Sequence, residues 1–394
     1  MGWNWDFCSG CTPGESAKEC SPNGGKYTTK TTISTLKTDD QTASPIVGMA
    51  NTNTVHLATT TSNASATLYE GKGKGKDFGK QVFAHYMLCF SAFGEKGTSE
   101  NATAGYQQEM AVAQVNGLDG FAIEYLGHDS YYLPSAIGMF AACEAYNAAL
   151  PPGGKPFQLF VIINFCCGLN KTDAVSLYTR FHASSCAHTL DDRSVFSSWS
   201  ATDSHLPWQA SVSAWEHEFY TPIAAAGLPK PFFLPFIYPA NYTGDPAAPH
   251  LPGHCSEGTC PETPDYKMQA AILNSTSGFG DALDGLWYWG CAPPADAVVN
   301  SSRDTVAACR AAGKYVATPV SGPYSPSGKT NNRYTPSHGG RSIIDVWTEH
   351  IASQPDMVIF TTWNDLGEHH YVGPHVHEQS PPHWHPGFQV HVRF

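Results

Sequence analysis

Eight short apolar runs recur along residues 81–363, and this recurrence limits the folds open to the chain. Most are separated by stretches with apolar residues every three or four positions, which predicts helices at 104–117, 135–150 and 342–354. Continuous apolar strands alternating with helices predict a parallel sheet covered by helices, and eight repeats predict an α/β fold, a closed (β/α)8 TIM barrel. The runs lie at 81–88, 120–125, 158–165, 194–199, 231–239, 285–290, 315–320 and 357–363.

A doubly wound open sheet is the alternative arrangement. No G-x-G-x-x-G loop follows the first run, which removes the usual nucleotide-binding interpretation. We therefore expect a barrel domain over residues 80–394. Residues 1–79 form a separate Cys- and Thr-rich N-terminal appendage and linker, for which a small β module and a Thr-rich stalk are both open.

Cysteines and glycosylation sequons predict a secreted, extracellular or cell-wall protein. The chain has 12 cysteines, an even number that could pair completely. Structural disulfides are favoured over a metal at Cys8 and Cys11, because no second C-x-x-C is present. The start of the sequence lacks a signal-peptide pattern, so either the signal was removed or this is not the native beginning. The predicted glycosylation sites are Asn63, Asn101, Asn170, Asn241, Asn274 and Asn300.

The charge balance excludes two classes of partner. The formal net charge is -12 with only 22 Lys and Arg, which gives no basic face for nucleic acid or anionic lipid. No apolar stretch approaches the roughly 20 residues that span a bilayer. We expect no nucleic acid, no membrane and no cofactor.

In a barrel of this kind, the active site lies at the carboxyl ends of the strands. The residues that end the eight runs are aromatics, amides and acids, without Lys or Arg. Aromatic rings pack against the apolar faces of sugars, and amides and carboxylates bind hydroxyls, so we expect a neutral carbohydrate. The alternative is that many of these aromatics belong to the core. The candidate substrate-binding residues are His85, Glu124, Asn164, Tyr238, Trp287, Trp289, Trp363 and His370.

Asp365 and Glu368 follow the eighth run on one short loop. Hydrolysis of a glycosidic bond needs two carboxyl groups, one protonated to release the leaving group and one ionised to activate water or attack carbon. Neighbouring carboxyls raise each other's pKa, which favours this division of roles. These two residues are the candidate catalytic pair.

Three segments resemble one known family. VFAHYM, GLDGFAIEY and TTWNDLGEHHYVGP are similar, in this order, to motifs of the fungal α-1,3-glucanases, the mutanases of glycoside hydrolase family 71. The resemblance covers roughly residues 81–388. It implies a (β/α)8 barrel, secretion, hydrolysis of α-1,3-glucan by an inverting mechanism, no metal, and catalytic roles for Asp365 and Glu368.

The sequence departs from the resembling family at several positions. Glu124 stands where the family usually has Asn, and His369 replaces the usual Ser. Asp119 matches a family residue counted as functional, yet it precedes the second strand and should lie at the opposite end of the barrel, so we interpret it as structural.

The histidine-rich tail offers a competing interpretation. Imidazole is a common metal ligand, and the H-x-H pairs would suit an extended strand. Gly-Pro and Pro-Pro breaks scatter these rings, and no H-E-x-x-H helix is present, so we expect no metal. His370 is assigned instead to a sugar hydroxyl or a carboxylate. The histidines of the tail are His369, His370, His375, His377, His383 and His385.

The sequence therefore predicts a secreted hydrolase of neutral α-glucan, with polysaccharide as substrate and N-linked glycans attached. The α-1,3 linkage rests on the family resemblance. The alternative is a glycosylated extracellular structural or carbohydrate-binding protein that retains the barrel without efficient catalysis, suggested by the appendage and the dense cysteines.

Overall fold

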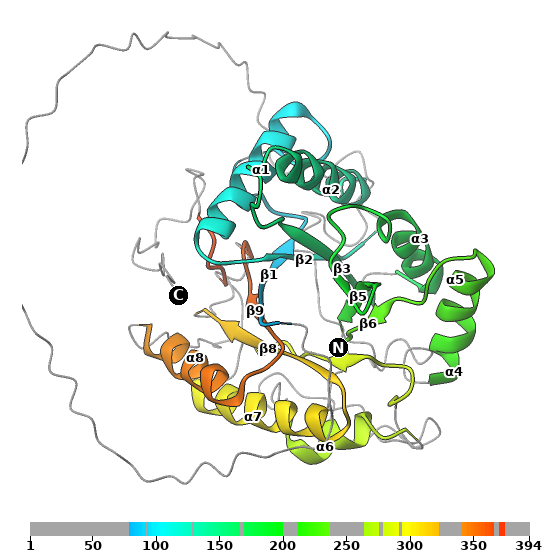
Figure 1. The fold of residues 1–394 in the computed structure, drawn as a ribbon, viewed down its shortest axis with the longest axis vertical. Coiled ribbons are helices and arrows are strands. Elements are labelled where there is room, and N and C mark those ends of the chain that lie inside the picture. The colour runs from blue at the N-terminus through cyan, green and yellow to red at the C-terminus, as the bar shows by residue number, and fades with distance from the viewer. Residues whose placement is uncertain are drawn as a thin grey trace, which may run out of the picture. The chain divides into compact units, whose positions relative to one another are not determined.

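The computed structural model describes residues 79–91, 93, 95–127, 130–165, 169–199, 212–236, 264–275, 279–290, 294–322, 340–365 and 370–374. The predicted appendage therefore lies outside the described residues except for its last position. Within the described part, parallel strands form the centre of the fold and helices lie around them (Figure 1).

Eight parallel strands coincide with the eight predicted runs, which confirms that prediction. Each run contains one strand, although the fifth and sixth runs contain strands of only two residues. The strands are β1 (Gln81–Met87), β2 (Gly120–Tyr125), β3 (Gln158–Asn164), β5 (Arg193–Trp199), β6 (Phe232–Phe233), β7 (Gly285–Leu286), β8 (Tyr315–Ser321) and β9 (Met357–Thr361).

The sheet curls into a barrel-like arrangement. Its hydrogen-bonded path runs β5-β3-β2-β1-β9-β8-β7, and β6 pairs with the other side of β5. A parallel bridge between Phe236 and Trp287 joins the segments that follow β6 and β7. The Trp287 amide also donates to the Pro235 carbonyl at 3.2 Å, so the two ends of the path meet.

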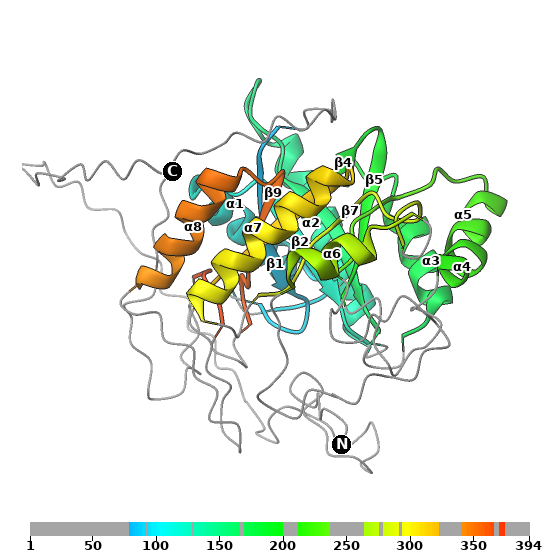
Figure 2. The ribbon, with the colours of Figure 1, turned by 90° about the horizontal axis from the view of Figure 1, so that it is seen from below.

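Helices connect consecutive strands and lie outside the sheet in both views (Figures 1 and 2). The predicted helices at 104–117, 135–150 and 342–354 are confirmed as α1, α2 and α8. Among the helices described, none combines the length and apolar character that crossing a bilayer requires. The helices are α1 (Glu100–Val115), α2 (Tyr132–Ala148), α3 (Lys171–Phe181), α4 (Val212–Trp215), the π-helix η3 (Glu216–Tyr220), α5 (Thr221–Ala225), α6 (Tyr266–Ile272), α7 (Ala295–Ala311) and α8 (Arg341–Ser353).

A short hairpin was not predicted. β4 (Thr189–Leu190) pairs antiparallel with the start of β5. The two residues between them, Asp191 and Asp192, have φ values of 54° and 58°. Two-residue hairpin turns need this left-handed conformation, which Asp tolerates better than most residues. The sequence lacks the Gly that would have marked the turn.

Helix α3 begins with a reciprocal cap. The Asn170 Oδ1 accepts the amide of Thr172 at 2.8 Å, and the Asp173 carboxylate accepts the Asn170 amide at 2.8 Å. These bonds satisfy amide groups that the first helical turn leaves without partners.

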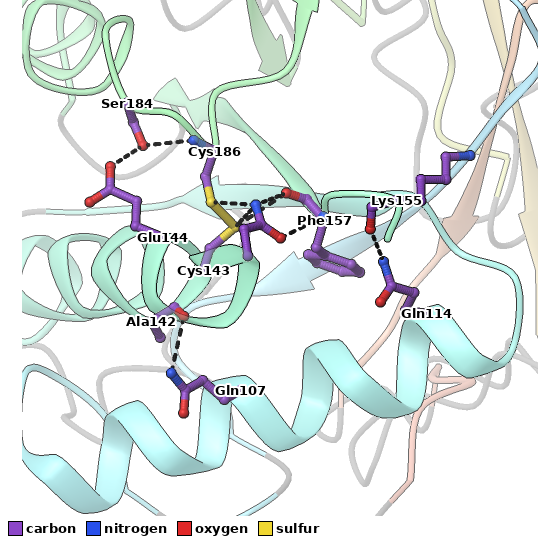
Figure 3. The surroundings of a disulfide bond; sticks show 10 residues. Gln107, Gln114, Ala142, Cys143, Glu144, Lys155, Phe157, Ser184 and Cys186 are labelled. Carbon is purple, nitrogen blue, oxygen red and sulfur yellow. Dashed lines mark hydrogen bonds between the residues drawn. A yellow bond between two sulfur atoms is a disulfide. The ribbon is translucent and has the colours of Figure 1, made fainter. Parts of the chain in front are cut away.

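A disulfide joins α2 to the segment after α3 (Figure 3). Cys143 and Cys186 are bonded, and beside them the Asn147 side chain donates to the Phe157 carbonyl and accepts the Phe157 amide, both at 2.8 Å. Cross-links of this kind stabilise chiefly by restricting the unfolded chain. Cys309 is free and buried, so the expectation that all cysteines could pair is not met.

Three aspartates clamp neighbouring strands at the amino ends of β2, β7 and β9. Asp119 donates its amide to the Val82 carbonyl and accepts the Val82 amide on its carboxylate. Asp284 makes the same reciprocal pair with Phe233, and Asp356 makes it with Val316. Asp119 therefore lies at the end of the sheet opposite the carboxyl ends of the strands, as the sequence argument expected.

Glycine follows two of these clamps for a steric reason. A Cβ atom on Gly120 would lie 2.0 Å from the Gln158 carbonyl oxygen, and one on Gly285 would lie 2.3 Å from the Tyr315 carbonyl oxygen. The Asp-Gly pairs thus combine a side-chain acceptor with a close approach of neighbouring backbones.

We expect Asp119→Ala to lower the free energy of unfolding by about 1–3 kcal/mol, because the Val82 amide loses a buried acceptor. Asp119→Asn keeps an acceptor oxygen and should cost less. Urea denaturation followed by circular dichroism measures both. The control is Lys155→Ala, which removes the exposed ion-pair partner of Asp119 and should cost under about 1 kcal/mol. Equal losses for Asp119→Ala and Lys155→Ala would contradict the clamp.

Candidate active site

Three polar side chains meet on the inner face of the sheet at the carboxyl ends of β1, β2 and β3. His85, Glu124 and Asn164 are only 0%, 4% and 2% exposed. The Asn164 amide donates to Glu124 Oε1 at 2.6 Å, and His85 Nε2 lies 3.6 Å from Glu124 Oε2. Because side chains alternate between the two faces of a strand, adjacent strands in register bring these residues together.

Tryptophans form an aromatic wall beside this group. The Trp289 ring meets the His85 ring edge-on at 4.7 Å, and Trp199 lies 6.4 Å from Trp289. Trp287 is buried and donates its indole N–H to Ser197 at 2.9 Å, so it supports the wall from the core. Trp289 is half-buried and is the more accessible of the two predicted tryptophans that follow β7.

The segment after β9 carries Asp365, and hydrogen bonds of Thr362 join the two ends of this segment. The Thr362 hydroxyl accepts the Asp365 amide at 2.8 Å and donates to the His370 carbonyl. The His370 amide donates to the Asp365 carbonyl at 3.0 Å. Both the amide and the carbonyl of Asp365 are therefore hydrogen-bonded. The residue is 5% exposed.

Asn364 anchors the same segment to β1. Its side chain accepts the Met87 amide at 2.7 Å and donates to the carbonyls of Met87 and Phe90 at 3.0 and 3.1 Å. The Trp363 amide donates to the His85 carbonyl at 2.6 Å. The residue before Asp365 thus uses both ends of its amide to fix the distance between β9 and β1.

The Trp363 side chain lies on the outer face of the sheet, away from the inner group formed by His85, Glu124 and Asn164. Its indole N–H donates to Glu109 Oε2 at 2.8 Å, and Tyr86 donates to Glu109 Oε1 at 3.0 Å. Trp363 is expected to contact substrate because it ends the eighth run, but it lies two residues beyond the end of β9, and its bond to Glu109 places its ring at α1. Its predicted contact with substrate finds no support in this placement.

Glu109 was not identified from the sequence. It is a fully buried carboxylate on α1 that receives hydrogen bonds from Tyr86 and Trp363. The available signal was an acid on the apolar side of the helix, where Tyr106, Met110 and Ala113 are also buried. A buried carboxylate requires donors, so this position pointed to a polar partner on the sheet.

His370 adds a second imidazole close enough to affect the pKa of His85. Its Nε2 shares a hydrogen bond of 2.7 Å with the Ser321 hydroxyl, and its ring lies 6.3 Å from Trp289. Burial lowers the pKa of His370 to about 3, so the imidazole is neutral at ordinary pH. The bond to Ser321 brings the end of β8 together with the segment after β9.

Burial shapes the charges of the inner group. It raises the pKa of Glu124 to about 7, against the lowering effect of the Asn164 bond and together with the raising effect of the Asp365 charge. Burial, followed by the nearby His370, lowers the pKa of His85 to about 3. A buried carboxyl with raised pKa beside an acid is a frequent property of catalytic sites.

Several predicted residues fall outside the described part of the chain. These include the second proposed catalytic residue, Glu368, together with Tyr238. Two of the sequon asparagines, Asn63 and Asn241, also lie outside the described residues. The four that are described are exposed: Asn101, Asn170, Asn274 and Asn300. The described residues contain no group of three His, Cys, Asp or Glu side chains placed to hold a metal ion. The tail histidines outside the described residues are His369, His375, His377, His383 and His385.

Comparison with known families identifies the chain. The profile described as Glycosyl hydrolase family 71 matches residues 78–391, which include the whole described region from β1 to the Asp365 segment. The chain belongs to glycosyl hydrolase family 71. The family resemblance found in the sequence is thereby confirmed. Membership of family 71 also supports the prediction that the chain is a glycoside hydrolase.

Relatives of this family 71 chain include named fungal enzymes. A glucan endo-1,3-alpha-glucosidase of Schizosaccharomyces pombe is 26% identical over 300 residues, covering 75% of this chain and 58% of the relative. A mutanase of Penicillium rubens is 23% identical, covering 76% of this chain and 55% of the relative. An ascus wall endo-1,3-alpha-glucanase of S. pombe is also 23% identical, with 75% and 58% covered. The chain spans less than two thirds of each relative.

Among solved structures, the family 71 chain resembles the GH99 endo-alpha-mannosidase from Bacteroides thetaiotaomicron. The TM-score is 0.52 at 10% identity, and the match covers 76% of this chain and 89% of that protein. A structure of the same enzyme with bis-tris propane gives 0.52 and covers 75% and 87%. Identity this low shows a shared fold only.

We expect Trp363→Phe to lower the free energy of unfolding by about 1–3 kcal/mol, because Glu109 loses a buried donor. Tyr86→Phe removes a second donor to the same carboxylate. The two effects should be non-additive by more than about 0.5 kcal/mol in a double-mutant cycle measured with urea. Additive losses would show that Glu109 does not couple β1 to the Asp365 segment.

Proposed function

We propose that this chain is a secreted glycoside hydrolase that cleaves α-1,3-glucan, a neutral polysaccharide. The observation that carries the proposal is the position of Asp365. Its nearly buried carboxylate follows the last strand of the sheet, faces the inner group closely enough for its charge to raise the pKa of Glu124, and lies in a family 71 chain. The relatives named as endo-1,3-alpha-glucanases support the linkage.

The proposed chemistry uses Asp365 and Glu368 as the two carboxyl groups of an inverting hydrolysis. Glu368 protonates the glycosidic oxygen of the leaving sugar, and Asp365 accepts a proton from the attacking water. The water attacks the anomeric carbon on the face opposite the leaving group, so one bond to that carbon forms as the glycosidic bond breaks. In inverting enzymes the two carboxyls lie about 6.5–9.5 Å apart, which leaves room for the water.

The proposed sugar site combines polar groups with an aromatic surface. His85, Glu124, Asn164 and His370 offer hydrogen bonds, and Trp289 offers a ring face, with Trp287 behind it. His85 and His370 are held neutral by burial, so these groups present no positive charge to the ligand. This pattern suits hydroxyl groups rather than phosphates or sugar acids. Tyr238 is proposed to extend the same surface.

The remaining expectations concern the whole protein. We propose that the curled sheet belongs to a complete (β/α)8 TIM barrel over residues 80–394, with residues 1–79 as a separate appendage. Export to the cell surface or wall is supported by the Cys143–Cys186 disulfide and by the relative named for the ascus wall. N-linked glycans are proposed on the four exposed sequon asparagines and on the two that lie outside the described residues.

The decisive experiment is release of reducing sugar from α-1,3-glucan by the purified full chain. Asp365→Asn and Glu368→Gln should each lower kcat by about 100-fold or more, because each removes a proton-transfer group. The anomeric configuration of the first product, followed by NMR, should be inverted. Asp345→Asn, on the exposed side of α8, serves as the control. Activity unchanged by both site substitutions would reject the catalytic assignment.

Failure of the parent chain to act on any α-glucan would favour the second candidate, an extracellular structural or carbohydrate-binding protein. If the protein then sediments with insoluble α-1,3-glucan without cleaving it, it is a carbohydrate-binding protein rather than a purely structural one.

A further inference from the structure

Glu124 has an oxygen that the described protein leaves available. Its Oε1 accepts the Asn164 amide at 2.6 Å. Its Oε2 lies 3.6 Å from His85 Nε2, beyond ordinary hydrogen-bond distance. The side chain is 4% exposed and projects from the carboxyl end of β2 into the inner group. One carboxyl oxygen is thus fixed by the protein and the other is directed at the proposed sugar site.

His85 also has unused hydrogen-bonding capacity. Neither of its ring nitrogens has a hydrogen-bond partner among the described residues, although the side chain is fully buried. Buried polar atoms are rarely left without partners, so an unpartnered imidazole inside a proposed ligand site indicates that a ligand group completes it. The adjacent Trp289 ring, 4.7 Å from His85, supplies the apolar surface for that ligand.

The surroundings of Glu124 favour its neutral form. The titratable or charged described groups that interact with it or with its partner His85 are His85 from β1 and Asp365 and His370 from the segment after β9. None of the described lysines or arginines pairs with Glu124. Both histidines are neutral and the acid repels a second negative charge. Burial is the largest effect, and together they raise the pKa of Glu124 to about 7.

A neutral carboxyl can do what a carboxylate cannot. It donates one hydrogen bond through its O–H while its other oxygen continues to accept from Asn164. The neutral His85 ring adds one acceptor and one donor close to the same point. A sugar hydroxyl both donates and accepts, so it can pair with Glu124 and His85 together.

We propose that Glu124 binds substrate as a neutral carboxylic acid, donating its proton in a hydrogen bond to one sugar hydroxyl beside Asp365, and that loss of this proton sets the upper pH limit of activity. Glu124 keeps its proton throughout the reaction, and His85 completes the hydroxyl site. This inference rests on the proposed glucan hydrolase and specifies how that site recognises its substrate.

The test compares pH profiles of kcat/KM for the full chain, Glu124→Gln and the surface control Glu144→Gln on α-1,3-glucan. Glutamine resembles the protonated acid, since its amide donates and its oxygen accepts. The parent and the control should lose activity about tenfold per pH unit above pH 7. Glu124→Gln should keep activity within about tenfold at pH 5 and lack that fall. Its activity at pH 8.5 relative to pH 5 should exceed the parent's by about 30-fold.

Two outcomes for Glu124→Gln would overturn the proposal. Loss of activity in Glu124→Gln at every pH would show that Glu124 transfers its proton, as a general acid does. A Glu124→Gln profile that falls with the parent's would show that another group sets the limit. As a second variant, Asn164→Ala removes the bond that lowers the pKa of Glu124, so its upper limit should move to higher pH; a move to lower pH would count against the proposal.

A stability measurement separates this inference from the proposed function. A group whose pKa is raised from 4.5 to about 7 by folding stabilises the native state fully below pH 4.5 and loses that contribution as pH rises to 7. The free energy of unfolding of the parent should therefore fall relative to Glu124→Gln between these values and run parallel outside them. A constant difference would refute the neutral carboxyl even if the enzyme cleaves glucan. If the chain is inactive but the parent and Glu124→Gln differ in unfolding free energy with the expected pH dependence, the glucanase proposal is rejected and the neutral Glu124 carboxyl is retained.

Discussion

Strand register is the constraint on which the site depends. A slip of one residue in any strand would turn its inner side chains outward, because successive residues point to opposite faces. Asp119, Asp284 and Asp356 resist such a slip at one end of the sheet, since each pairs with both the amide and the carbonyl of a single residue on the neighbouring strand. The grouping of polar side chains at the other end follows from this fixed alignment.

The segment carrying Asp365 shows how a loop beyond the sheet is held with similar definition. Asn364 ties it to β1, Thr362 ties it to His370, and Trp363 ties it to Glu109 behind the sheet. These contacts lie on different sides of the segment, so no single one determines its position. Side chains that do not meet the ligand thereby reduce the reorganisation that a reacting carboxylate would otherwise require.

The sequence predicted the elements of this fold better than the direction of their side chains. Eight strands could be found because each is a continuous apolar run buried on both faces, a pattern that survives without knowledge of partners. The same pattern hides which residues face inward, so Trp363 was grouped with His85 although the two rings lie on opposite faces. Glu109 could not be assigned because its donors come from positions up to 254 residues away. The raised pKa of Glu124 depends on burial that only the assembled sheet provides.

The cap of α3 affects how modification of this protein should be studied. A glycan on Asn170 would be attached through Nδ2, whereas the helix uses Oδ1, so the two can coexist on one side chain. Replacing Asn170 to remove the sugar would also remove the cap, and any resulting loss of secretion would be ambiguous. Changing Thr172 to Ala removes the sequon and leaves the Asn170 oxygen in place. Sugar attachment and helix initiation can therefore be separated at two positions of the same turn.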